Sequence, residues 1–127
     1  MNENDFLRRV QELGALATRE DAERWAMAVL GALSDLIADP AHRRHFGAQL
    51  PGALKTQLLA GEPRAYDMDP DGLVQRVARA LDAHAPEGSR AVRVVYRVLK
   101  EAVSPGQIAE FEGDLSPRLV TFLAGPE

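Results

Sequence analysis

Apolar residues recur every three or four positions along most of the chain, which is the spacing of one face of an α-helix. Pro, Gly and helix-capping residues interrupt this pattern and divide the chain into segments. The segments predict about eight helices, which begin near residues 4, 18, 39, 51, 69, 86, 104 and 116. In each half of the chain, two longer helices precede two shorter ones. The sequence therefore predicts an all-α fold.

Capping residues mark most of the predicted helix starts. Thr18 suits the N-cap of the second helix, and an Asp or Ser followed by Pro marks four other starts. These four pairs are Asp39-Pro40, Asp69-Pro70, Ser104-Pro105 and Ser116-Pro117. Gln107 lies three residues after Ser104 and completes the pattern of a capping box. Gly14 is predicted to stop the first helix.

The segment 92–98 is the one place where the helix prediction competes with a strand. It is rich in Val, and β-branched residues favour strands. However, strict two-residue alternation fails at Val94-Val95, while the cationic residues of this region recur at helical spacing on the opposite side. We therefore predict a helix here.

The second half of the chain matches the first at an offset of about 65 to 67 residues. Four apolar residues in the first half match four in the second: Phe46, Leu50, Leu54 and Leu58 match Phe111, Leu115, Leu119 and Leu123. This match predicts one domain over residues 1–127, with one pseudo-repeat at about 4–60, a linker at about 61–68 and a second pseudo-repeat at about 69–124. Because each half is marginal in size on its own, we expect the two to share one core.

Composition adds limits on the class of protein. The 127 residues are 46% hydrophobic and 27% charged, include no Cys, and carry a net charge of −4. This describes one globular domain without disulfides or thiolate metal ligands. The acidic balance argues against general nucleic-acid binding. With no secretory signal and no membrane-length apolar run, we expect a cytoplasmic protein without membrane contact.

Three sequence motifs carry a family resemblance. They are the start Phe6-Leu7-Arg8-Arg9-Val10, the element Gln49-Leu50-Pro51, and the tract 98–108, which reads VLKEAVSPGQI. In this order they resemble the bacterial domain of unknown function 2267 family, from about Asp5 to Leu123. The resemblance implies a duplicated all-helical unit and brings no catalytic residues. The chain departs from the family pattern at Leu115-Ser116-Pro117 and in the linker 60–69.

Four cations on the predicted sixth helix are the first candidate for a functional surface. They are Arg90, Arg93, Arg97 and Lys100, and their spacing of three, four and three residues aligns them along one helix face. Like charges at this spacing repel one another, so a neighbouring group must offset them. Acidic neighbours such as Glu87 or Glu101 are one explanation. An acidic partner or a phosphate group is the other.

Metal binding has weaker candidates. Asp67, Asp69 and Asp71, followed by Gly72, match the first half of a calcium-binding loop, but the position of its bidentate Glu is occupied by Ala78. Capping of the helix at Pro70 explains these acids equally well. His42 and His45 lie one helical turn apart without an obvious third ligand, so a solvated polar face is the simpler interpretation.

No catalytic motif is present in the sequence: it lacks a nucleophile elbow, a phosphate-binding Gly loop and a His-Glu-x-x-His pair. We therefore expect a non-enzymatic module, without cofactor, that binds an unidentified protein partner through the four cations. The alternative is a ligand- or metal-binding regulatory protein with a pocket between the repeats. The two pseudo-repeats can complete one core within a single chain, so a monomer is expected. An exposed edge at Trp25 or Leu30 would equally permit a homodimer.

Overall fold

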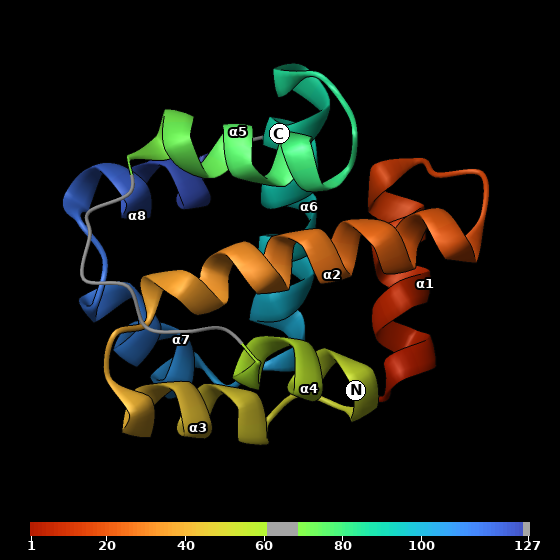
Figure 1. Ribbon diagram of the computed structural model, residues 1–127. Coiled ribbons are helices and arrows are strands. Elements are labelled where there is room, and N and C mark those ends of the chain that lie inside the picture. The colour runs from red at the N-terminus through yellow and green to blue at the C-terminus, as the bar shows by residue number, and fades with distance from the viewer. Residues whose placement is uncertain (61–68, 126–127) are drawn as a thin grey trace.

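The computed structural model describes residues 1–60 and 69–125, and over these residues the chain forms eight α-helices and no strand (Figure 1). The helices are α1 (Glu3–Gly14), α2 (Arg19–Leu36), α3 (Pro40–Ala48), α4 (Gly52–Leu59), α5 (Pro70–Ala80), α6 (Ala85–Ala102), α7 (Pro105–Gly113) and α8 (Pro117–Ala124). The predicted all-α fold is confirmed. The Val-rich segment 92–98 lies inside α6, as its helical spacing predicted.

The order of helix lengths is the same in both halves of the chain. α1 to α4 have 12, 18, 9 and 8 residues, and α5 to α8 have 11, 18, 9 and 8. The packing is also reciprocal, because α1 contacts α6 while α5 contacts α2, and α3 contacts its counterpart α7. Both observations favour the internal repeat, which stays a prediction.

The turns after α1 and α5 share an unusual conformation. Ala15 and Asp82 adopt left-handed φ angles of 51° and 53°, although this region usually takes Gly. At each turn, the N–H of the next residue donates to the carbonyl five positions back, from Leu16 to Gln11 and from Ala83 to Ala78, both at 2.9 Å. Gly14 ends α1 as predicted, but the left-handed residue is Ala15.

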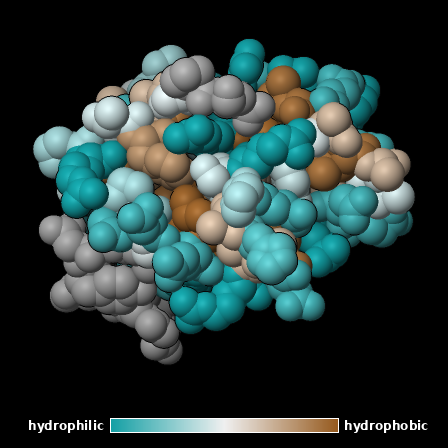
Figure 2. All heavy atoms as spheres, turned by 90° about the horizontal axis from the view of Figure 1, so that it is seen from above, coloured by the Kyte–Doolittle hydropathy of each residue, from teal (hydrophilic) through white to brown (hydrophobic). Residues whose placement is uncertain are grey.

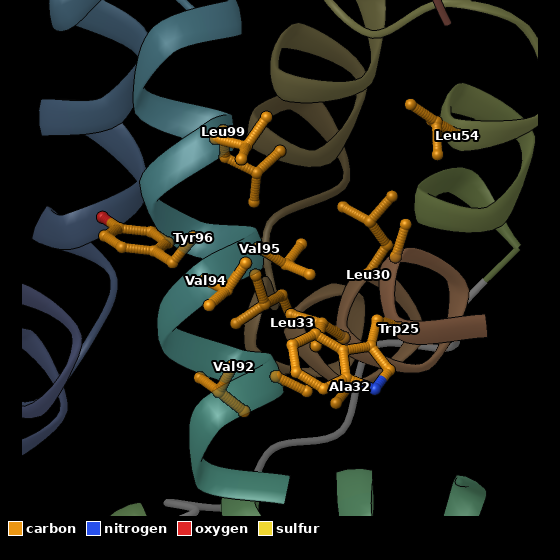
Figure 3. Packing of buried hydrophobic residues seen from close by; sticks show 14 of the residues in the cluster. Trp25, Leu30, Ala32, Leu33, Leu54, Val92, Val94, Val95, Tyr96 and Leu99 are labelled. Carbon is orange, nitrogen blue, oxygen red and sulfur yellow. The ribbon is translucent and has the colours of Figure 1, made fainter. Parts of the chain in front are cut away.

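α2 and α6 form the centre of the molecule, where α2 crosses in front of α6 (Figure 1). Their facing side chains are fully buried, and Leu30 and Leu33 of α2 lie toward Val95 of α6 (Figure 3). The core extends to α4 through Leu54 and to α7 through Phe111. Residues from both halves therefore share one core.

The edge of α2 that we considered for a homodimer is not exposed. Trp25 is 4% exposed and Leu30 is fully buried. Gly14 makes room for the indole ring, because a Cβ at position 14 would lie 2.9 Å from a Trp25 ring carbon. Trp25 is thus a core residue of α2 that packs against the end of α1.

Three polar residues near the end of α2 are buried among these apolar side chains: Ser34, Asp35 and Arg43. Arg43 donates to the carbonyls of Ser34 and Ile37, at 2.8 and 3.0 Å, and so satisfies the C-terminal end of α2. Asp35 pairs with Arg76 of α5. Burial lowers the pKa of both Arg43 and Arg76. Arg76 is therefore more than an ordinary surface residue, because its charge compensates a buried carboxylate.

Candidate functional site

The four predicted cations lie on α6, but they have different surroundings. Arg90 donates to the carbonyl of Gly14 at the end of α1, and its guanidinium lies 5.5 Å from the Trp25 ring centre. A cation at the C-terminal end of a helix also interacts favourably with the helix dipole. Arg90 therefore stabilises the contact between α1 and α6.

Arg93 and Lys100 both lie over aromatic rings. The Arg93 guanidinium is 4.7 Å from the ring centre of Phe122 on α8, and Lys100 Nζ is 5.5 Å from the ring centre of Tyr96. Tyr96 points away from the α2 side of α6 (Figure 3), and its hydroxyl donates to Glu112 of α7 at 2.6 Å. Together with Arg90 over Trp25, three of the four charges are thus partly compensated by aromatic faces.

A pocket of about 410 Å³ opens between α6 and the end of α8. Three of the predicted cations contribute to its wall, whereas Arg90 does not. The lining residues are Arg93, Arg97, Lys100, Glu101, Leu123, Ala124 and Gly125. The structure therefore brings most of the predicted cationic stripe to one concave site.

Glu101 is the single carboxylate among the described residues that line this pocket, and it is engaged with α1. Both of its oxygens accept from Arg9, each at 2.9 Å. This bidentate pair lowers the pKa of Glu101 and raises that of Arg9. Glu101 was expected to offset the cations of α6, but its main partner is Arg9. The charge of Arg97 also lowers the pKa of Glu101, but within the described residues neither Arg97 nor Lys100 forms a direct salt bridge.

The apolar surface of the molecule is broken into small areas on the face seen in Figure 2. Hydrophilic residues cover most of this face, and the hydrophobic ones show between them in separate groups. Among the described residues, the large apolar side chains classed as exposed are Met1 and Leu59. A partner that binds this face meets mainly polar and charged groups.

The acidic candidates for a metal site do not come together among the described residues. Asp69 caps α5 by accepting from the N–H of Gly72 at 2.7 Å, and Asp71 is exposed in the first turn of that helix. Asp67 lies outside the described residues. Within residues 1–60 and 69–125, no group of three His, Asp or Glu side chains has a geometry that could hold a metal ion.

The two histidines lie in a charged cluster between α3 and α7. His42 Nδ1 is 2.7 Å from Asp114 Oδ2, and its Nε2 is 3.3 Å from Glu110 Oε1 and 3.6 Å from Asp39 Oδ2. His45 Nδ1 is 3.4 Å from the same Glu110 oxygen. The hydrogen bond to Asp114 raises the pKa of His42. Sequence reasoning missed this cluster because two of its carboxylates, Glu110 and Asp114, lie 65 to 72 residues away from the histidines that they contact.

A second pocket, of about 270 Å³, joins the two halves of the chain. The first half contributes Leu16, Asp21, Arg24 and Trp25, and the second half contributes Glu87 and Arg90. Arg24 also donates to the carbonyl of Leu81 at 3.0 Å. This pocket lies where a ligand site between the repeats was expected.

Comparison with known proteins identifies a family without an assigned activity. Among the described residues, no helix is long and apolar enough to cross a membrane. No curated protein matches the chain. Residues 3–122 match the family described as uncharacterized conserved protein DUF2267, which covers all eight helices except the end of α8. Since the match spans nearly the whole sequence, the chain belongs to the DUF2267 family.

Proposed function

We propose that this protein is a non-enzymatic interaction module, without cofactor, that binds a protein partner at the pocket between α6 and α8. The observation that carries the proposal is the position of Arg93, Arg97 and Lys100 around one open pocket of about 410 Å³. Concave sites that combine charged groups with apolar walls are common places for recognition.

Arg97 and Lys100 are the residues on which the proposal depends most. Both are exposed, and neither has an ion pair within the described part of the chain. Arg90 belongs to the α1–α6 contact, so its substitution would test stability more than binding. The overall charge of −4 favours a protein partner over nucleic acid, because a polyanion would be repelled by the rest of the surface.

An affinity pull-down from cells that naturally produce the protein tests this function. The variant Arg97→Glu/Lys100→Glu reverses two pocket charges. The control Lys55→Glu/Arg79→Glu reverses two exposed charges on α4 and α5, so both variants change the net charge equally. Circular dichroism and urea unfolding first establish that all three proteins fold.

The expected result is a stoichiometric protein recovered with the wild type and with the control, and lost with the pocket variant. Recovery of the same proteins by all three forms would contradict a role for the pocket. Absence of any stoichiometric protein from all three would contradict the interaction module itself. The same cells give the compartment by fractionation, and we propose the cytoplasm.

The pocket between the two halves supports a second function, a regulatory protein that binds a small ligand. The supporting observation is that Trp25 and Arg90, which come from different halves, line it together. A ligand there would bridge α2 and α6 and raise the midpoint of thermal unfolding. A thermal-shift screen of metabolites and Ca²⁺ tests this function, and an unchanged midpoint across the panel would count against it.

A further inference from the structure

We infer that the pocket between α6 and α8 binds an acidic peptide segment in which carboxylate side chains lie next to an apolar one. This inference rests on the proposed function and names the chemistry of the partner. The carboxylates would lie between Arg97 and Lys100, and the apolar side chain would lie against the α8 wall at Leu123 and Ala124.

Charge is the first step of the argument. Arg93, Arg97 and Lys100 share one side of the pocket, and the opposing helix α8 contains no Asp or Glu. Glu101 is the carboxylate among the described lining residues, but its two oxygens are already bonded to Arg9. The described residues that line the pocket therefore carry more positive than negative charge in a protein that is acidic overall, and an anionic group would relieve the repulsion between Arg97 and Lys100.

The geometry of the two exposed cations is the second step. Arg97 lies one helical turn from both Arg93 and Glu101 on α6, and all three residues line the pocket. A guanidinium presents paired donors that match the two oxygens of a carboxylate. Lys100 adds a second, more compact charge one turn further along. Two neighbouring acidic side chains satisfy this pair better than one does.

The apolar wall is the third step, and it favours a peptide over a free anion. Leu123 and Ala124 of α8 line the pocket together with the cations, so an inorganic phosphate would leave this apolar part of the lining without a contact. An acidic residue next to an apolar one contacts both parts of the lining. The net charge of −4 makes a long polyanion such as nucleic acid unfavourable, whereas a short segment meets only the local field.

Fluorescence anisotropy on the full chain tests this inference directly. The probe is a short fluorescein-labelled peptide in which Glu residues flank one Leu in a Gly-Ser background. Two control peptides replace all Glu by Gln, or the Leu by Ser. The proteins are the wild type, Arg97→Glu/Lys100→Glu, and the control Lys55→Glu/Arg79→Glu. A further variant, Ala124→Glu, places an internal carboxylate at the exposed edge of the same pocket.

Saturable binding of the Glu-Leu peptide by the wild type and the control is the expected result. The pocket variant and Ala124→Glu should each weaken the affinity by about tenfold or more, since loss of a charge-assisted contact commonly costs this much. The Gln peptide should not bind, and the Ser peptide should bind more weakly. Ala124→Glu keeps the test valid even if reversing two adjacent charges on α6 disturbs the fold.

Three outcomes would overturn the inference. The first is equal binding of the Gln peptide, which would show that charge is not recognised. The second is an equal loss of affinity in the control variant, which would show a general effect of net charge. The third is displacement of the peptide by inorganic phosphate at a similar concentration, which would assign the pocket to a free anion.

Failure here differs from failure of the proposed function. If the pull-down recovers a partner through the pocket but the Glu-Leu peptide neither binds nor displaces it, the interaction module stands and its acidic partner segment is wrong. If neither experiment gives binding that depends on Arg97 and Lys100, both proposals are wrong.

Discussion

Gln49, the residue after α3, holds Ser104, the residue before α7, through both ends of its amide group. Its Oε1 accepts from the N–H of Ser104 at 2.7 Å, and its Nε2 donates to Ser104 Oγ at 3.2 Å. Ser104 Oγ in turn accepts from the N–H of Gln107 at 3.3 Å. The capping box predicted at this start is therefore completed by Gln49, while the Gln107 side chain donates to Glu110 at 2.7 Å.

Substitution of Gln49 by Ala should destabilise the protein by about 1 kcal/mol, because one residue then loses both hydrogen bonds at the start of α7. Gln107→Ala should cost less, since its side chain does not reach Ser104. Urea unfolding of the two variants beside the wild type measures the difference. A larger loss for Gln107→Ala would mean that the local capping box forms in solution instead.

This cap illustrates what sequence reasoning could reach. Ser104 and Pro105 predicted the start of α7 correctly, because capping depends on residues within one turn. Gln49 could not be found in this way, since it is 55 positions from Ser104 and meets it only when α3 packs against α7. Local signals fix where helices begin. They do not identify the side chains that tertiary packing brings to those ends.

The four cations of α6 show the same limit of sequence reasoning. Its helical spacing placed the four cations on one face of α6, and three of them do line one pocket. The spacing could not reveal that Arg90 serves the end of α1, or that Glu101 is held by Arg9. Both contacts join residues far apart in the chain. The spacing therefore predicted that the four cations share one face of α6, but not which of them line the pocket.

The turn after α1 gives a second prediction. Ala15 has a left-handed φ of 51°, which costs a residue with a Cβ more than it costs Gly. Ala15→Gly should therefore stabilise the protein by about 0.5 to 1 kcal/mol, although the added freedom of the unfolded chain offsets part of this gain. Chemical denaturation measures the change. A lower stability would show that Ala15 does not hold this conformation.

Gly14, one residue earlier, is the matched comparison, since its role is to leave space. A Cβ there would lie 2.9 Å from the Trp25 ring and 3.1 Å from a Leu16 side-chain carbon. Gly14→Ala should destabilise the protein by roughly 1 to 3 kcal/mol through overpacking. Opposite signs for the two adjacent substitutions would distinguish the backbone requirement at Ala15 from the packing requirement at Gly14.

Gly88 supports a third prediction at the crossing of α5 and α6. A Cβ there would lie 2.7 Å from the carbonyl oxygen of Val74 and 2.9 Å from the Cβ of Ala78. Because the nearest atom belongs to the backbone, Gly88→Ala should force the helices apart and cost about 1 to 3 kcal/mol. Gly106→Ala, where nothing lies within 4 Å, is the control and should be neutral or slightly stabilising. Similar urea midpoints for both variants would contradict close packing at Gly88.

The cluster between α3 and α7 predicts how stability depends on pH. His42 faces Asp114 and Glu110 of the second half and Asp39 of its own, and His45 shares Glu110. The hydrogen bond that His42 donates to Asp114 raises the folded-state pKa of His42 above its usual value of about 6.5. The folded state therefore binds this proton more tightly than the unfolded chain does. This contribution is fully present below about pH 6.5 and is lost as the pH rises through the folded-state pKa.

The carboxylates of this cluster set the lower pH limit of its stabilising effect. The pKa of Asp39 is lowered chiefly by the N–H of Ala41, and that of Glu110 chiefly by Gln107. Their contribution is present above their usual pKa values, near pH 4, and is lost as the pH falls further. The cluster should therefore stabilise the α3–α7 contact most between about pH 5 and pH 6.5.

Urea unfolding of the wild type and His42→Gln between about pH 5 and pH 9 tests this dependence. The wild type should be more stable near pH 6, and its advantage over His42→Gln should shrink as the pH rises. His84→Gln is the control, because His84 is exposed before α6 and makes no capping hydrogen bond with its side chain. A pH-independent difference for His42→Gln would mean that His42 acts as a neutral hydrogen-bonding group. An equal pH dependence of stability for His84→Gln would show that the effect does not arise from the α3–α7 cluster.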